Sequence, residues 1–565
     1  MHKLRAAANA VWATKELTRP ASRRTRTSAN SKLRAAGTAV VAAKRASIIR
    51  IDTVTLEMER ARTRDSDIVR SVPIGRILHR AAEKFGSSKG VAADYALSTP
   101  TESIGYFLSH SWHASRLDKF LTLWVFFRLP AATLGALLFS LLGFILTVAE
   151  ILPSATVTER FSDLAAGGQS SGHALWCSLF SIVGFCVGGM LQGYAERFGV
   201  LRGHGAFLDK LCIHQTDNDL KSKGIRSLGL FLRRSRKLFI LWSPEYFTRL
   251  WCCFEVAAFE QAVREETNHE QTDRIIFRPV QLGAVLAAYG VSVVCMTGGV
   301  QLVPVIRGDG DLLLVALVNF FVALTVGIVV VRPIFSYARA RADLFHQLQS
   351  FSFEKAQCFA ESDRALIIQM LTLWHSPDEH DSEAAIQEFD SMVREKLYSL
   401  VKQQAGEPLP YKLAAMVCVA ASGPFWDIYA SRLMVPSSIL AEARAIDHTL
   451  YLVYLLCTVL MFQTGTLRMF INFGTITYPK RGASTRKYML HCAACVVLTL
   501  VVELGIYYVH RTLFYLLAPR FGLAVGVASV LVLEGFHVVI AWRWWRIWCV
   551  NIDRWRGGRV ESSWA

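Results

Sequence analysis

Residues that could do chemistry come directly after the apolar segments of this 565-residue chain, or one turn into a helix. Those after the apolar segments are Ser109, His110, Ser111, Trp112, Asp209, Lys210, Trp242, Ser243 and Pro244. Glu255 follows Trp251 by one helical turn. These side chains suit a nucleotide or a sugar. A carboxylate such as that of Glu255 can stabilise an oxocarbenium-like cation while it polarises a hydroxyl or a water molecule.

Short strands alternating with helices must position these residues. Apolar strands are predicted at 104–109, around 207–210, at 236–242 and at 274–280, with an amphipathic helix between the second and third. This alternation predicts a parallel sheet covered by helices. Ligands of such sheets bind beyond the carboxyl ends of the strands, so we expect the polar residues to gather there.

Four pieces of this region, in order, resemble the Toll/interleukin-1 receptor (TIR) superfamily. They are FLSHSW at 107–112, FLDK at 207–210, RKLFILWSPEYF at 236–247 and RLWCCFE at 249–255. The last is similar to the W-C-x-x-E helix start of TIR domains. The resemblance implies that Glu255 is catalytic, as in the members that cleave NAD, and that Trp251 is its structural partner. It also implies that the loop 109–112 belongs to the nucleotide pocket, with NAD as a substrate and no bound cofactor.

Each of these residues also has a simpler interpretation. Glu255 would stabilise the first turns of a helix through the helix dipole. Asp209 and Lys210 would orient a ligand or pair with each other in a loop. His110 would be a structural histidine. No metal site is predicted, since a strand separates the candidate ligands His204, Cys212 and His214.

The composition predicts a membrane protein. Hydrophobic residues make up 52% of the chain, and its mean hydropathy is +0.31. We expect an α-helical multi-pass membrane protein of about eight spans, with a cytoplasmic α/β flavodoxin-like (TIR-like) parallel-sheet domain split by a membrane hairpin. The expected spans are 129–152, 174–195, 282–303, 312–331, 413–429, 450–470, 488–509 and 521–542. The fifth run is short and broken by Pro424, so it is also interpreted as re-entrant or interfacial.

Charge predicts the orientation of the chain. The loop around 480–487 and the C-terminal tail are the most basic connections, so the positive-inside rule places the N-terminus, the α/β module and the C-terminus in the cytoplasm. Residues 1–50 hold twelve Lys and Arg but a single acid, Glu16, which favours a disordered basic arm near lipid over a transit peptide. The expected partners are the lipid bilayer and a second copy through the TIR-like part, with no nucleic acid.

The chain is therefore divided into seven parts. They are a basic, largely disordered N-terminal region (1–103), a split TIR-like domain (104–112 and 200–280), a membrane hairpin insertion (113–199), a second membrane hairpin (281–335), a cytoplasmic helical pair (336–410), a C-terminal membrane bundle (411–545) and a cytoplasmic tail (546–565).

The hairpin insertion departs from the TIR pattern. A TIR domain has one amphipathic helix between its first two strands, where this chain has about 90 residues with two expected spans. We expect the second span to continue past the bilayer as that helix, through residues 193–197. Because the chain enters the membrane from the carboxyl ends of two strands, we also expect Glu255 to lie close to the cytoplasmic bilayer surface.

Three classes of function fit this organisation. The first is a membrane-tethered enzyme that hydrolyses NAD and signals through NAD loss or its products. The second is a TIR-like scaffold that self-associates and recruits partners without chemistry. The third is a transporter with a regulatory module, because ionisable residues inside a membrane are costly and mark function. The residues that support transport are Glu503, Glu534 and His537, which would otherwise bond to neighbouring helices.

Overall fold

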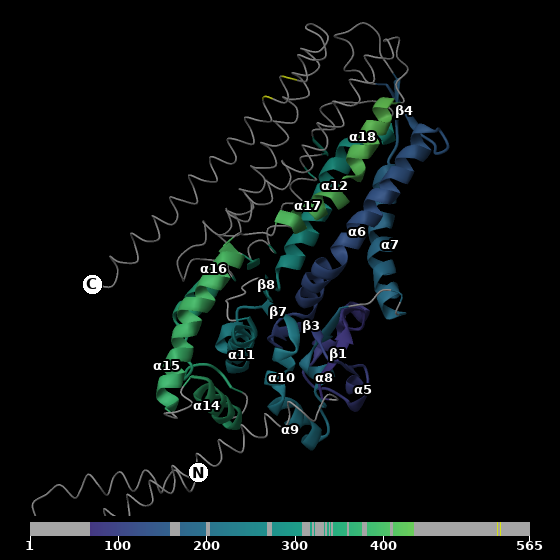
Figure 1. Ribbon diagram of the computed structural model, residues 1–565. Coiled ribbons are helices and arrows are strands. Elements are labelled where there is room, and N and C mark those ends of the chain that lie inside the picture. The colour runs from purple at the N-terminus through teal and green to yellow at the C-terminus, as the bar shows by residue number, and fades with distance from the viewer. Residues whose placement is uncertain are drawn as a thin grey trace, which may run out of the picture.

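A six-stranded sheet forms the centre of the α/β module (Figure 1). The computed structural model describes residues 68–158, 170–198, 204–267, 274–307, 343–358, 361–375, 381–406 and 411–433, with a few isolated positions elsewhere. The strands of the sheet, in spatial order, are β2 (Thr99–Pro100), β1 (Arg70–Pro73), β6 (Gly205–Phe207), β3 (Ile104–His110), β7 (Ser235–Trp242) and β8 (Ile275–Pro279).

The sheet is mixed, so the prediction of a parallel sheet is wrong. Strands β6, β3, β7 and β8 run parallel, whereas β1 pairs antiparallel with both β6 and β2. The two added strands come from the region before residue 104. They are too short, at four and two residues, for an alternating pattern, and each contains a proline. Proline is tolerated near sheet edges, which is where these strands lie.

Helices cover both faces of the sheet. Tyr106 and Phe107 are neighbours on β3, so their side chains point to opposite faces. Tyr106 contacts Phe127 of helix α6 (Arg116–Val148), with ring centroids 5.1 Å apart. Phe107 stacks on Phe207, which contacts Phe231 of helix α10 (Leu228–Arg233). Helix α6 therefore covers one face, and α10 covers the other together with its neighbour α11 (Leu250–Thr267).

Helix α6 belongs to two parts of the molecule. Its start lies at the carboxyl ends of the strands, where the Thr122 hydroxyl donates to the Val280 carbonyl over 2.7 Å. By Phe127 it has reached His204, which directly precedes β6, so it has crossed to the amino edge of the sheet. Its later part leaves the module (Figure 1). The sheet-covering helix is thus the start of the first apolar run, not the end of the second as expected.

Helix α7 (Trp176–Arg197) returns alongside α6 to the start of β6. Glycines permit this close contact. A Cβ added to Gly135 would lie 2.2 Å from the Gly184 carbonyl oxygen, and one added to Gly188 would lie 2.3 Å from that of Ala131. Small residues spaced four apart, as Gly184 and Gly188 are, are typical of tightly packed helices in membranes. A short hairpin of β4 (Ala155–Thr158) and β5 (Ser170–His173) lies between the two helices in sequence.

The prediction of about eight spans in a multi-pass membrane protein is wrong. Among the described residues, two helices, α6 and α7, are long and apolar enough to cross a membrane. A third span results only if the pair Lys412–Ala420 and Gly423–Ser431, bent by 44°, is one span. The expected runs 312–331, 450–470, 488–509 and 521–542 lie outside the described residues.

Part of the apolar sequence that suggested spans is protein core. Helix α12 (Leu282–Arg307) begins directly after β8 and lies along α6. Its residues Leu282, Val285 and Leu286 are at most 2% exposed. They pack on α6 and on helix α17 (Tyr411–Ala420). The face of an apolar helix that packs against protein needs no lipid, and hydropathy alone does not distinguish the two cases.

Helix α18 (Gly423–Leu433) closes the bundle by capping α7. The Asp427 carboxylate accepts hydrogen bonds from the backbone N–H groups of Cys177 and Ser178, over 2.7 and 3.0 Å, and from the Ser178 hydroxyl. The first N–H groups of a helix have no partner inside the helix, so a carboxylate there satisfies them. Segments 250 residues apart are held together by this contact.

Helices α14 (Glu361–His375), α15 (Ser382–Met392) and α16 (Tyr398–Gly406) pack beyond α11 (Figure 1). A five-residue π-turn at Val393–Leu397 joins the last two. Their apolar side chains Ile367, Phe389 and Val393 are wholly buried and continue the core of the α/β module. This region was expected to be a separate helical pair.

A left-handed turn lies between β1 and β3. Arg80, Ala81 and Ala82 have φ values of 49°, 52° and 54°. This conformation costs roughly 1–2 kcal/mol for each residue that has a Cβ. The turn leads into the 3₁₀ helix η1 (Glu83–Gly86), which carries the buried Phe85.

Replacing Ala81 with glycine is expected to stabilise the protein by about 1 kcal/mol, because glycine adopts a positive φ without steric cost. Thermal or denaturant unfolding of the purified protein measures this change. Ala93 is the matched control, since it lies exposed in the short right-handed helix α5 (Ala92–Tyr95). There the same substitution should destabilise by roughly 0.5–1 kcal/mol. Destabilisation by Ala81→Gly would contradict a strained turn.

Candidate functional site

Ser109 and Glu255 lie in direct contact at the carboxyl edge of the sheet. The Ser109 hydroxyl is hydrogen-bonded to the Glu255 carboxylate and also to the Tyr246 hydroxyl. The Tyr246 hydroxyl lies 3.3 Å from the Cys252 carbonyl oxygen, to which it can donate. Ser109 and Tyr246 are at most 1% exposed, whereas Glu255 is half-buried. Ser109 thus forms one chain of hydroxyl and carboxyl groups with two residues more than 130 positions later in the sequence.

Local structure explains why these side chains meet. Ser109 is the second-last residue of β3, with its side chain on the face that α11 covers. Tyr246 lies in the 3₁₀ turn η3 (Tyr246–Thr248) that follows β7, and Glu255 lies in the second turn of α11. β6 and β7 flank β3 on opposite sides, so the chain changes direction across the sheet at β3. Such a switch point is where open α/β sheets bind ligands.

The hydroxyl chain can satisfy Glu255 in either protonation state. When the carboxylate is ionised, Ser109 donates to it and Tyr246 can donate to Ser109. When the carboxyl is protonated, it can donate to Ser109, Ser109 to Tyr246, and Tyr246 to the Cys252 carbonyl. Glu255 can therefore bind or release a proton without leaving a buried hydroxyl group unpaired.

Burial raises the pKa of Glu255 to about 8. The hydrogen bond from Ser109 opposes this rise, and the neighbouring charge of Asp209 adds to it. A glutamate with this pKa is mostly protonated at neutral pH and can change its charge near neutrality. Buried carboxyl groups with strongly shifted pKa values are typical of catalytic sites.

This shift predicts how stability depends on pH. The folded protein binds the Glu255 proton more tightly than the unfolded chain, whose ordinary pKa is 4.5. The stabilisation is therefore complete below about pH 4.5 and is lost as the pH rises to about 8. Between about pH 5 and 9 the melting temperature of the wild type should fall relative to that of Glu255→Gln, because glutamine resembles the protonated side chain and does not ionise. Parallel curves would contradict the shift, and Glu245→Gln, at an exposed position, should follow the wild type.

A second group lies beside the first and contains Trp112, Asp209 and His110. The Trp112 indole N–H donates to the Asp209 carboxylate over 3.1 Å. Burial raises the pKa of Asp209, while the hydrogen bonds and nearby lysines oppose this rise. The His110 ring lies 4.6 Å from that of Trp112 and 4.9 Å from that of Phe85. Burial holds the pKa of His110 well below its usual range, and the charge of Lys119 adds to this effect, so the ring is neutral.

Lys119 completes this second group, although no sequence signal singled it out. It lies in the first turns of α6, in the part that covers the sheet, before the apolar part at 129–148. It is fully buried, with its amino group 5.3 Å from the Phe85 ring and 5.5 Å from the Trp112 ring. Burial lowers its pKa to about 8, and the Asp209 charge opposes this. The sequence placed this lysine in the polar flank of an expected membrane span.

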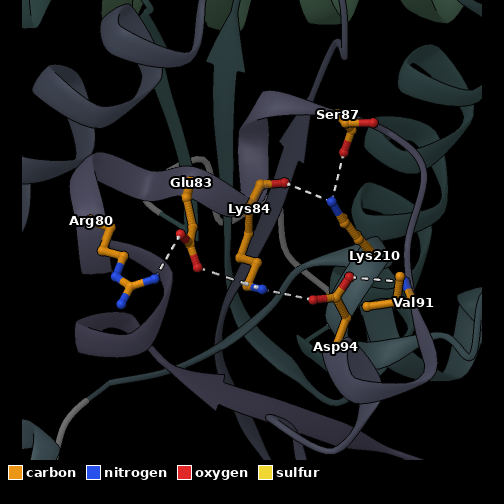
Figure 2. Close-up of polar contacts among 7 residues, drawn as sticks. All are labelled: Arg80, Glu83, Lys84, Ser87, Val91, Asp94 and Lys210. Carbon is orange, nitrogen blue, oxygen red and sulfur yellow. Dashed lines mark hydrogen bonds and ion pairs between the residues drawn. The ribbon is translucent and has the colours of Figure 1, made fainter.

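The Lys210 amino group does not point to the site, and Lys210 pairs with the Asp209 carboxylate only through its backbone N–H, over 2.7 Å. Its amino group donates to the backbone carbonyls of Lys84 and Ser87, over 3.3 and 2.8 Å (Figure 2). The Lys84 amino group is in turn paired with Asp94 over 2.8 Å. Lys210 therefore holds the segment that carries Phe85, and its role is structural.

The remaining predicted residues lie apart from Glu255. The Trp251 indole N–H donates to Asp363 of α14, so this side chain joins α11 to the helical region. The Ser111 hydroxyl accepts a 3.4 Å bond from the backbone N–H of His113 and shapes the loop. The intramembrane candidates Glu503, Glu534 and His537 lie outside the described residues. Among the side chains that are described, no three His, Cys, Asp or Glu could hold a metal ion.

The site faces away from the apolar helices, contrary to the expectation that Glu255 lies at a bilayer surface. Helix α6 starts at the carboxyl edge and runs back along the sheet, so it leaves the module at its amino edge, and α12 starts beside the beginning of α6 and lies along it. Ten residues of α6 separate Lys119 from Leu129, which is about 15 Å along the helix. The expectation was wrong because a helix that follows a strand packs antiparallel to it before it goes further.

Comparisons with known proteins identified no relative of this chain. A scan against models of known protein families, a search of curated proteins and a search of solved structures found no match. The residues of the site and their geometry therefore carry the functional argument.

Proposed function

We propose that the α/β module is a TIR-like enzyme that hydrolyses NAD at the bond between nicotinamide and ribose. The observation that carries this proposal is the contact between Ser109 and Glu255, from the first strand and the helix that the TIR resemblance named. The raised pKa of Glu255 and the position of the pair at the switch point of the sheet support it.

The reaction would use Glu255 in two ways. As the C–N bond breaks, its electron pair goes to the pyridine nitrogen, neutral nicotinamide leaves, and positive charge develops on the ribose. An ionised Glu255 stabilises that charge, and the positive charge of the bound nicotinamide ring favours ionisation of the carboxyl group. Water then attacks the ribose carbon, and its proton passes to Glu255 and along the Ser109–Tyr246 chain.

We further propose that α6 and α7 tether this module to a membrane, with the module on the cytoplasmic side. Large apolar side chains on their outer surfaces support the tether. They are 44–61% exposed and include Leu134, Leu138, Leu141, Ile145, Leu179, Ile182, Met190 and Leu191. Contiguous exposed apolar surface of this kind marks contact with lipid or protein. The active site would then face the cytosol, on the side of the module away from the lipid.

The test is an assay of purified full-length protein with NAD, in which release of nicotinamide is followed by chromatography. The expected result is turnover by the wild type and none by Glu255→Ala. Turnover that survives this substitution would overturn the role of Glu255. If the wild type has no turnover in any oligomeric state, the proposal fails and a non-enzymatic scaffold is favoured.

A further inference from the structure

Two buried polar atoms of the second group have no hydrogen-bond partner within the described part of the chain. They are the amino nitrogen of Lys119 and Nε2 of His110. Their residues are 0% and 8% exposed. Both side chains lie against the same two rings, those of Phe85 and Trp112. The two atoms therefore belong to one small environment.

Cation–π contacts with the two rings offset only part of the cost of burying Lys119. A buried ammonium group without a hydrogen-bonded partner is costly, because it has lost its hydrogen bonds to water and has gained no group of equal polarity in exchange. Its place in the first turns of a helix adds to the cost, since the N-terminal end of a helix dipole repels cations. The nearest carboxylate, Asp209, accepts its side-chain hydrogen bond from Trp112 instead. A methionine would fill the same space between the rings without these costs.

The chemistry of the two groups indicates an anionic ligand. A lysine ammonium offers three N–H donors, and a neutral histidine offers one N–H donor at Nε2 when that nitrogen carries the ring proton. Such groups bind the oxygens of a phosphate, and lysine commonly does so as a point charge. The Asp209 charge acts on both Glu255 and Lys119, so the two groups lie near the same edge of the sheet, on opposite faces, and would hold neighbouring parts of one ligand. Phosphates of nucleotides bind at this edge of open α/β sheets.

We propose that Lys119 and His110 form a subsite for a phosphate group and that Phe85 covers it. The link to a dinucleotide rests on the proposed function, whereas the phosphate chemistry does not. Phe85 is carried by the segment that Lys210 holds through the Lys84 and Ser87 carbonyls (Figure 2). The left-handed turn at Arg80–Ala82 directly precedes that segment, and its strain lowers the cost of moving it. A phosphate reaches Lys119 when Phe85 moves aside.

Calorimetric titration of the full-length protein with inorganic pyrophosphate, ADP and adenosine tests the subsite. The expected result is binding of pyrophosphate and ADP but not of adenosine. Lys119→Met should weaken pyrophosphate binding at least about tenfold and should raise the melting temperature, since it removes an unpaired buried charge. Lys89→Met, at an exposed lysine of the same neighbourhood, should change neither.

Each outcome bears on the proposal. Tighter binding of ADP than of pyrophosphate identifies a nucleotide as the source of the phosphate, and equal binding identifies a free phosphate anion. No binding of pyrophosphate, or binding that Lys119→Met leaves unchanged, overturns the subsite. If Lys119→Met does not fold, His110→Leu is measured instead and should also weaken binding. Glu255→Gln should keep pyrophosphate binding even where NAD turnover is absent, so failure of the enzymatic proposal is distinguishable from failure of the subsite.

Discussion

Replacing Glu255 with glutamine is expected to lower the kcat for NAD hydrolysis by about a thousandfold, with little change in KM. Removal of an acid–base group costs typically 10²–10⁴-fold, and loss of a charge that stabilises the transition state costs about as much. Glutamine keeps the size of the side chain and can still accept the hydrogen bond from Ser109. The loss of kcat therefore measures the contribution of the Glu255 carboxylate and not a change in folding.

Two controls make this measurement specific. Glu245 is exposed in the turn before Tyr246, so Glu245→Gln should leave kcat unchanged. The melting temperature of Glu255→Gln should lie near or above that of the wild type at pH 8, because the substitution removes a buried ionisable group. A variant that folds and retains most of its kcat would show that Glu255 has a structural role alone.

Breaking the ion pair between Arg128 and Glu196 is expected to have the largest effect on stability. The Arg128 guanidinium donates to the Glu196 carboxylate over 2.7 Å, and the two side chains are 3% and 5% exposed. Glu196→Gln leaves the arginine buried without a counter-charge, which costs about 3–5 kcal/mol. Gln192 holds the same carboxylate over 3.0 Å and also donates to the Phe127 carbonyl, near Pro130 inside α6.

A double substitution separates the charge effect from packing. Arg128→Met with Glu196→Leu removes both charges, and the pair should recover most of the stability that either single change loses. Melting temperatures of the four proteins in one detergent provide the comparison. If the double variant is as unstable as the singles added together, the two residues act independently and the ion pair contributes nothing as a pair.

The sequence located three of the four predicted strands well because they are apolar and bounded by polar residues. The strand predicted around 207–210 was misplaced, since β6 ends at Phe207 and Asp209 begins the short helix α8 (Asp209–Cys212). The prediction at 104–109 corresponds to β3 at Ile104–His110, and that at 274–280 corresponds to β8 at Ile275–Pro279. The resemblance also named Ser109 and Glu255, which the fold brings into contact. Local patterns carry this much information because strand boundaries depend on neighbouring residues.

The remaining features depend on contacts between distant segments, which no local pattern contains. Lys119 lies in the sequence LDKFLTLW, where it reads as the flank of a span, and its burial depends on Phe85 and Trp112. Lys210 reads as part of the site, yet its partners are carbonyls more than 120 residues earlier. The apolar run from Leu282 reads as a span because hydropathy does not distinguish lipid from a neighbouring helix.

The α6–α7 pair also bears on how the chain folds. Strands β3 and β6 are neighbours in the sheet but are separated by about 95 residues of sequence, which would ordinarily make their pairing slow. The antiparallel contact of α6 with α7 brings the end of the insertion back to its beginning, so most of this closure entropy is lost when the hairpin forms. The insertion thus brings β3 and β6 close together, and assembly of the helix pair should precede completion of the sheet.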